Sequence, residues 1–454
     1  MKKYPLLFKL GTMFLLLLLL WIPLSMVRSL VQERIEYSHT ATYEVSRLSA
    51  GQQIVLGPFM YWPYTETFTG AVAAPVGKVD LIRQTNQHQF LRFAQTLQVD
   101  AELTTQSLKR GLFPVTVYQS EHKLKGQFQS QEAPAVRAQH QGGVVNKGRP
   151  LLVFQVSDLR GLSGTPSMQL GGRTLKLSSF TLPGLGTVLG AELPEAAWTQ
   201  VLPFELSFGL GGTGSVGWVP LGDTSDMALR SDWQHPRFEG DFLPRERDIS
   251  HQGFTARWST TSLASQAQRQ LSEQLSEARR QLSEPVREAS RLGGGWSGER
   301  MQVELINPND IYQQIDRATK YGLIFVLLTF IGFFLFELVR QWRIHPMQYL
   351  MVGAALTVFF LLLLSLAEIL GFAMAYGLAT SACVGLLTVY LSAVLGGYRR
   401  SLGMSVLLVA LYGLLYGILM SEDNALLMGS LLLFGALSAT MLITRKLDWY
   451  KAGA

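Results

Sequence analysis

The chain has 454 residues, of which 48% are apolar and only 16% are charged, a balance that is unusual for a soluble protein. Its length allows two or three domains. The formal net charge of +6 comes largely from short basic clusters beside long apolar runs. Such clusters indicate anchoring at a membrane surface and argue against nucleic acid as a partner.

The first apolar run covers residues 10–27 and includes the block FLLLLLLWIPL. It approaches the length of about 20 residues that crosses a hydrocarbon core. Lys2, Lys3 and Lys9 precede it, as they would in a signal peptide. The run is longer than a signal peptide's apolar region, and no small-residue cleavage site follows it. We expect an uncleaved signal-anchor helix, with residues 1–27 as the cytoplasmic N-terminus and first span; a cleaved signal peptide is the alternative.

Residues 28–318 have the composition of a soluble domain and predict a mainly β fold. Residues 97–103 alternate between apolar and polar side chains, and residues 227–233, 254–260 and 301–305 do the same. This period of two is typical of half-buried strands. The runs PVTVYQ, LLVFQV and PFELSF, with Gly and Pro clusters between them, indicate further strands. A sandwich or a mixed β domain is expected.

One glycine-rich stretch raises the question of a nucleotide site. Residues 212–219, GTGSVGWV, fit the glycine-rich loop of protein kinases and, in their first six positions, the dinucleotide fingerprint. A kinase needs a strand lysine shortly after the loop and two later aspartates, yet no Lys occurs between this stretch and Lys320, and H-R-D and D-F-G are absent. A dinucleotide site needs a helix at the third glycine, whereas Trp218 and Pro220 favour extended chain. We expect a structural strand or bulge, and no nucleotide or other cofactor.

Catalytic and metal-binding patterns are weak in this domain. Its six histidines form neither H-x-x-x-H nor H-E-x-x-H, and no G-x-S-x-G elbow is present. We therefore expect no enzymatic activity and no metal. Residues 232–248, DWQHPRFEGDFLPRERD, gather charge, histidine and aromatic rings. They could line a cleft, but a charged loop with proline-defined turns is favoured.

Residues 263–292 differ from the strands around them, because they repeat Q-L-S-E three times. Apolar residues at steps of four and three predict an amphipathic helix. They are Leu271, Leu275, Ala278, Leu282 and Ala289. Pro285 should kink or end it. Packing on its own domain is the favoured interpretation, and presentation to a partner or to the membrane surface is the alternative.

After Tyr321 the chain predicts a C-terminal bundle of five transmembrane helices within residues 319–443, followed by a cytoplasmic tail at 444–454. The apolar runs cover residues 321–339, 347–367, 372–396, 402–420 and 425–443. Basic residues lie in alternate connections and at both termini, and the other connections carry only acidic ones. The basic residues beyond the N-terminus are Arg340, Arg343, Arg399, Arg400, Arg445, Lys446 and Lys451; the acidic ones are Glu368, Glu422 and Asp423. By the positive-inside rule both termini are cytoplasmic, and residues 28–318 lie outside the cytoplasm.

Ionisable residues in spans are functional candidates by default. Glu337 should lie near the cytoplasmic face, paired with Arg340 or Arg343 as an interfacial anchor, and Glu368 near the external face. The two carboxylates should therefore not share a site. Pro346 suits the first turn of the following span, and His345 before it is either an interface residue or a switch.

Several long stretches resemble the CreD family of bacterial inner-membrane proteins. They are DRATKYGLIFVLLTFIGFFLFE (316–337), HPMQYLMVGAALTVFFLLLLSLAEILGF (345–372), WQHPRFEGDFLP (233–244) and LITRKLDWY (442–450). Two N-terminal stretches agree as well, IPLSMVRSLVQERIEY and IVLGPFMYWP. Asp316 and Arg317, which begin the first stretch, join Glu337, Glu368 and His345 as possible functional residues.

The resemblance covers most of the chain and implies a Gram-negative inner-membrane protein with its large domain in the periplasm. It implies a role in envelope integrity and in tolerance of envelope stress, colicins or β-lactams, under a two-component regulator. No catalytic residue transfers with it. We expect a non-catalytic protein whose partners are membrane lipids and an unidentified envelope protein or lipid. The alternative is a transporter or lipid-handling protein that uses a path among the spans; a hydrolase has no supporting motif.

Overall fold

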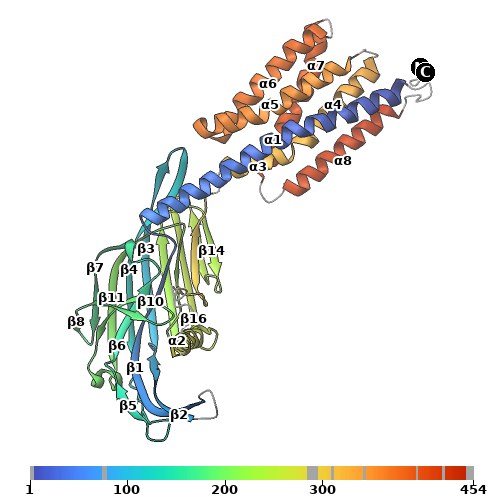
Figure 1. Ribbon diagram of the computed structural model, residues 1–454. Helices are drawn as coiled ribbons and strands as arrows, with labels where there is room; N and C mark the ends of the chain where they lie inside the picture. Colours follow the sequence, from blue (N-terminus) through green and yellow to red (C-terminus); the bar gives the residue numbers. More distant parts are fainter. Residues whose placement is uncertain are drawn as a thin grey trace. The chain divides into compact units, whose positions relative to one another are not determined.

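The computed structural model describes residues 5–73, 79–283, 295–307, 311–340, 344–394, 397–421 and 425–445. The chain forms two compact units (Figure 1): a helical unit of Met1–His39 with Asn309–Ala454, and a β unit of Thr40–Pro308. Some residues named above lie outside the described part: Lys2, Lys3, Pro285, Ala289, Arg343, Glu422, Asp423, Lys446 and Lys451. The side chains of Leu282, Arg340, Arg399 and Arg400 also lie outside it.

The first helix does not end with its apolar run. α1 is continuous from Pro5 to Leu48, 44 residues in all. The helix therefore continues beyond residue 27, where the first span was expected to end, and the β unit begins at Thr40. The physical reason is that hydropathy marks where a helix leaves the hydrocarbon and not where it ends. Residues 24–50 contain neither Gly nor Pro, so no helix-breaking residue interrupts the backbone before Gly51.

The five expected C-terminal spans are present as helices. They are α4 (Gly322–Arg340), α5 (Pro346–Leu370), α6 (Phe372–Val394), α7 (Tyr398–Met420) and α8 (Ala425–Thr444). Across the described residues, five helices including α1 are long and apolar enough to cross a membrane by themselves. The pair α3–α4 adds a sixth if its 45° bend is counted within one span.

α3 (Ile311–Lys320) corrects the other expected boundary, at residue 318. It belongs to the helical unit, which resumes at Asn309. Its apolar side chains Tyr312, Ile315 and Ala318 are buried, because they recur at steps of three and form one face of the helix. A short amphipathic helix thus precedes the second apolar run, where composition alone suggested the end of a soluble domain.

The β unit is a sandwich of two mixed sheets. Among the described residues, a nine-stranded sheet has the order β14 (Pro236–Gly240), β17 (Met301–Leu305), β12 (Ser215–Trp218), β1 (Gln53–Ala73), β6 (Leu151–Val156), β10 (Gly186–Glu192) and β9 (Ser178–Leu182), with β2 (Val79–Arg92) and β5 (Val144–Lys147) also paired to β1. An eight-stranded sheet has the order β15 (Glu246–Ser250), β16 (Gly253–Thr261), β13 (Thr224–Ser231), β3 (Thr96–Arg110), β4 (Phe113–Phe128), β11 (Leu202–Thr213), β7 (Leu162–Leu170) and β8 (Arg173–Leu175). Two short 3-10 turns, Leu159–Gly161 and Glu195–Thr199, connect strands.

The main core lies between the two sheets. The alternation at residues 97–103 is confirmed, because Leu97, Val99, Ala101 and Leu103 of β3 all point into this core. β6 is buried along its whole length. Its alternate residues enter the main core on one face and a second core on the other, so both faces of this central strand are covered and the run reads as continuously apolar.

The second core lies beneath α2 (Ala267–Ser283), which is the predicted Q-L-S-E helix. Leu271 and Leu275 are fully buried there against the nine-stranded sheet, so packing on its own domain is confirmed. The helix begins at Ala267 because the Ser265 hydroxyl accepts a hydrogen bond from the Ala267 N–H at 3.1 Å, and Glu299 accepts one from Gln266 at 2.8 Å.

Two stretches singled out by their composition form strands. GTGSVGWV ends β11, turns at Gly214 with a φ of +78° and continues as β12, which confirms a structural glycine stretch. Residues 232–248 were expected to be a charged loop, and this is wrong for much of their length. They contribute β14 and β15. Pro236 is tolerated because it begins an edge strand, where no N–H is needed.

Candidate functional site

The first group of functional candidates lies at the end of α4 in the helical unit. The Glu337 carboxylate, whose side chain is only 11% exposed, forms an ion pair with Lys9 of α1. It also accepts hydrogen bonds from the Tyr349 hydroxyl at 3.0 Å and the Ile344 N–H at 3.3 Å. Lys9 is therefore a partner of Glu337 that the sequence did not indicate, and the side chains of the predicted partners, Arg340 and Arg343, fall outside the described residues. We call Glu337, Lys9, Tyr349 and Ile344 the Glu337 cluster.

The second group lies at the last turn of α5. Glu368, also 11% exposed, pairs with Arg34 of α1 at 3.5 Å and accepts a hydrogen bond from the Tyr312 hydroxyl at 3.4 Å. A carboxylate at a helix C-terminus is unfavourable with the helix dipole. The Arg34 cation offsets that cost. Glu368, Arg34 and Tyr312 form the Glu368 cluster.

Asp316 of α3 is tied to α1 as well. Its buried carboxylate accepts a hydrogen bond from the Gln32 amide at 2.7 Å and pairs with Lys320 at 2.6 Å. Arg317, its neighbour, is half-buried and has contacts of its own. The pairing of Asp316 with Gln32 holds α3 beside α1, which explains why these helices belong to one unit.

The two clusters lie far apart along the bundle. Tyr349 lies in the first turn of α5 and Glu368 in its last, 19 residues apart, which is about 28 Å along the helix. The prediction that Glu337 and Glu368 do not share a site is confirmed. α1 instead contacts both: Lys9 near its start and Arg34 further along. The ionic candidates therefore fasten the first helix to the bundle at two levels.

His345 has a local structural role. It is the N-cap of α5, where its Nδ1 accepts a hydrogen bond from the Met347 N–H at 3.2 Å, and Gln348 accepts one from the His345 N–H at 3.0 Å. This reciprocal pair satisfies two helix-end donors. Pro346 follows as the first helical residue, as predicted.

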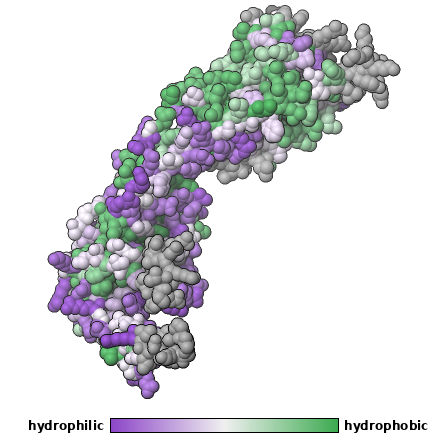
Figure 2. All heavy atoms as spheres, viewed as in Figure 1, coloured by the Kyte–Doolittle hydropathy of each residue, from purple (hydrophilic) through white to green (hydrophobic). Residues whose placement is uncertain are grey.

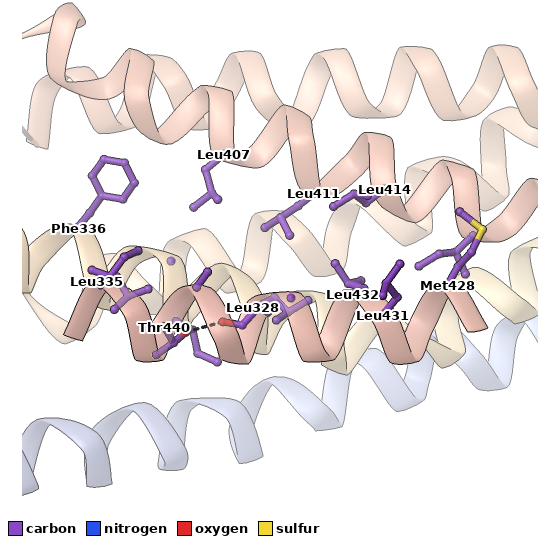
Figure 3. A pocket seen from close by; sticks show the side chains of 17 residues that line it. Leu328, Leu335, Phe336, Leu407, Leu411, Leu414, Met428, Leu431, Leu432 and Thr440 are labelled. Atoms are coloured by element: carbon purple, nitrogen blue, oxygen red, sulfur yellow. Dashed lines mark hydrogen bonds between the residues drawn. The ribbon is translucent and has the colours of Figure 1, made fainter. Parts of the chain in front are cut away.

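The helical unit also contains an apolar cavity. Figure 2 shows apolar residues over much of the visible surface of this unit. Between α4, α7 and α8 a slot of about 760 Å³ opens, lined among others by Leu328, Leu335, Leu407, Leu411 and Leu431 (Figure 3). It exists because α8 presents Gly435, Ala436 and Ala439, which are too small to fill it. We call this cavity the α8 slot.

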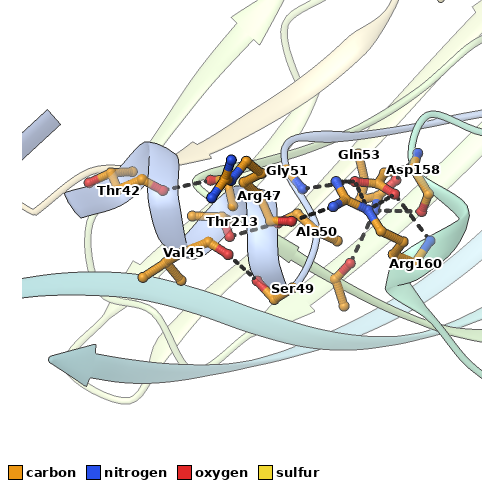
Figure 4. Close-up of polar contacts among 12 residues, drawn as sticks. Thr42, Val45, Arg47, Ser49, Ala50, Gly51, Gln53, Asp158, Arg160 and Thr213 are labelled. Atoms are coloured by element: carbon orange, nitrogen blue, oxygen red, sulfur yellow. Dashed lines mark hydrogen bonds and ion pairs between the residues drawn. The ribbon is translucent and has the colours of Figure 1, made fainter. Parts of the chain in front are cut away.

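In the β unit, the end of α1 is held by a compact polar network (Figure 4). The Arg160 guanidinium donates to the carbonyl of Arg47 in the last turn of the helix and pairs with Asp158 at 2.6 Å. Hydrogen bonding from Arg160 lowers the pKa of Asp158. The Thr213 hydroxyl donates to the Ala50 carbonyl at 2.8 Å. A cation at a helix C-terminus satisfies carbonyls that have no partner within the helix, so this network ends α1 and joins it to the sheets.

Sequence reasoning did not single out His122, the fully buried histidine of β4. Its ring stacks on Phe208 with centroids 4.9 Å apart, and burial lowers its pKa from 6.5 to about 3. The signal was available in the strand pattern, since Tyr118, Ser120, His122 and Leu124 occupy every second position. The inward face of β4 therefore includes the histidine.

The described residues lack the grouping that a metal site requires. No cluster of three or more His, Cys, Asp or Glu residues with metal-ligand geometry occurs in the part of the chain that the structure describes. Cys383 is buried in α6, where its Sγ accepts a hydrogen bond from the Tyr412 hydroxyl at 3.1 Å. Glu337 and Glu368 are paired instead with cations of α1.

The fold and its ionic clusters define a membrane protein in which a β-sandwich is inserted between the first and second apolar helices. A family model described as "Inner membrane protein CreD" matches residues 5–450. The inner membrane protein CreD of Escherichia coli (strain K12) is 34% identical over 459 residues, an alignment that covers 99% of this chain and 95% of that protein. The chain belongs to the CreD family and is an inner membrane protein with several membrane-spanning helices.

Proposed function

We propose that this protein supports cell-envelope integrity, and with it tolerance of envelope stress, colicins and β-lactams, through a periplasmic β unit that binds an envelope protein or lipid without catalysing a reaction. Both termini are cytoplasmic in this proposal. The observation that carries it is the insertion of a complete two-sheet sandwich between α1 and α3. A domain tethered to the membrane at both of its ends is suited to contact other envelope components.

The orientation is supported by charge. If the helices cross the membrane in alternating directions, one side of it carries Lys9 before the first span and Arg445 after the last. The connections on that same side carry Arg340, Arg343, Arg399 and Arg400. The chain enters and leaves the β unit at the opposite end, where Gln32 and Asp316 contact each other. Because basic residues favour the cytoplasmic side, the β unit would be periplasmic.

The orientation can be tested by cysteine labelling, because the one native thiol, Cys383, is buried. In a Cys383→Ser background, Gln252→Cys in the exposed turn before β16 should react with a membrane-impermeant maleimide in cells with a permeabilised outer membrane. Arg445→Cys, after α8, should react only when the inner membrane is broken. Labelling of Arg445→Cys in unbroken cells would contradict the orientation.

The envelope role is tested in the bacterium that carries the protein. Deletion should lower β-lactam and colicin tolerance, and the full chain should restore it. A chain in which residues 52–306 of the β unit are replaced by a Gly–Ser linker should reach the membrane but restore nothing. If the linker chain restored tolerance at equal membrane abundance, the helices and not the β unit would carry the function.

A lipid-handling role is the second candidate, and the α8 slot favours it. A proton- or ion-coupled transporter has less support, because Glu337 and Glu368 lie near the ends of the bundle, whereas such sites lie near the bilayer midplane. Lipid handling predicts that filling the slot would lower tolerance as much as removing the β unit does.

A further inference from the structure

The α8 slot has the lining of a hydrocarbon site. Side chains from α4, α7 and α8 converge on it, and nearly all of them are apolar (Figure 3). The polar exception, Thr440, donates its hydroxyl hydrogen to the Ala436 carbonyl at 2.7 Å. No described polar atom of the lining therefore requires water or a polar ligand.

The surroundings of the slot decide what can enter it. Its helices cross the inner membrane, where the surrounding medium is lipid hydrocarbon and not water. The lining on α8 runs from Met428 to Ile443, which is about 22 Å along the helix. The slot volume of about 760 Å³ lies in the range of ordinary small-molecule sites. A long apolar cavity of this kind matches an extended acyl chain.

A cation lies at one end of the slot. Arg445 follows α8 directly, two residues beyond Ile443, and its side chain is exposed. It has no ion pair among the described residues. Long basic side chains at helix ends extend to the membrane interface, where they attract lipid phosphates. The apolar slot and this cation are thus complementary to the two parts of a phospholipid.

We propose that the α8 slot binds a glycerophospholipid, with one acyl chain between α4, α7 and α8 and its phosphate against Arg445. The site selects the phosphate by charge and the chain by shape. It goes beyond the envelope role proposed above and does not depend on it, since loss of this lipid would leave the membrane orientation and the β unit unchanged.

Two glycines offer positions for a variant that fills the slot and for its control. A Cβ added at Gly435 would meet nothing within 4 Å, and the same is true of a Cβ at Gly413 on α7, which does not line the slot. Gly435→Phe should therefore fill the slot, and Gly413→Phe is the matched control with the same added ring on an exposed helix face. Gly435→Leu is the milder version if the phenylalanine variant fails to fold.

The test is native mass spectrometry of the full chain, released from detergent and titrated with dioleoyl phosphatidylglycerol. Wild type and Gly413→Phe should retain one tightly bound lipid, and Gly435→Phe should bind it at least tenfold more weakly. Arg445→Gln should weaken the phospholipid about fivefold, the effect of one basic residue at a membrane surface, and leave dioleoylglycerol, which has no phosphate, unchanged.

Three results would overturn the proposal. The first is equal phospholipid binding by Gly435→Phe and wild type, with both folded by circular dichroism and size-exclusion chromatography. The second is equal loss in Gly413→Phe, which would indicate nonspecific annular lipid. The third is a wild-type dimer that Gly435→Phe dissociates, because the slot would then be a contact between two copies of the chain.

Discussion

Protonation of one buried side chain should control how the β unit responds to acid. Ser120 donates its hydroxyl hydrogen to the Leu210 carbonyl at 2.7 Å, so at 2.8 Å it accepts the N–H of His122 Nε2. The Trp218 indole N–H donates to His122 Nδ1 at 3.3 Å. The imidazole is therefore neutral, with its proton on Nε2, and a second proton on Nδ1 would face another N–H.

The magnitude follows from the pKa of His122, which burial lowers from 6.5 to about 3. As the pH falls below 6.5, the unfolded chain binds a proton that the folded chain does not bind until about pH 3. Folding stability therefore decreases through this window, by about 1.4 kcal/mol per pH unit. Between pH 7 and pH 5 the loss from this residue should be about 2 kcal/mol.

The assay compares pH dependences, because other groups titrate as well. The full chain in detergent is unfolded in urea at pH 7 and at pH 5. Trp21, Trp342 and Trp449 are replaced by Phe, so that the fluorescence of the remaining tryptophans reports on the β unit. His122→Gln can still donate to Ser120, and it should lose about 2 kcal/mol less between the two pH values than the parent chain. His235→Gln, at an exposed position, is the control. Equal losses in the parent chain and His122→Gln would refute the reasoning.

Two further predictions concern a close glycine contact and a buried ion pair. Gly212→Ala should lower the free energy of unfolding of the β unit by about 1–3 kcal/mol, because its Cβ would lie 2.6 Å from Tyr118 Cζ. Gly51→Ala is the control and should change this stability little, since its Cβ would meet nothing within 4 Å. Neither variant should bind ATP or NAD in calorimetric titration. Glu337→Gln should cost about 1–3 kcal/mol in thermal unfolding, more than an exposed anchoring pair would, and adding Lys9→Met should recover part of that loss. Unchanged stability and membrane abundance together with lost β-lactam tolerance would instead assign Glu337 a proton-transfer role.

Local patterns in the sequence were sufficient to predict the apolar helices, several strands and the structural nature of the glycine stretch. A membrane-spanning helix satisfies its own backbone hydrogen bonds, so an apolar run of sufficient length identifies it without knowledge of its neighbours. Residues 97–103 predicted β3 for a similar reason, since alternation reports one covered face. Gly214 lies at a turn before an extended Trp218, as the missing lysine and helix signals indicated. The family resemblance also depended on sequence alone.

Tertiary structure decided which residues meet. Lys9 and Glu337 are 328 positions apart, and no periodicity of the chain connects them, so sequence proximity suggested only the nearby arginines as partners. The continuation of α1 to Leu48 depends on a helix C-terminus that Arg160, from a distant turn, satisfies. Alternation along β4 places His122 on the inward face, but its partners Trp218 and Phe208 come from other strands, and the α8 slot exists only because Gly435 and its small neighbours face two other helices. Periodicity reports how a residue relates to its own helix or strand, whereas pairing, burial and cavities depend on contacts between segments that folding brings together.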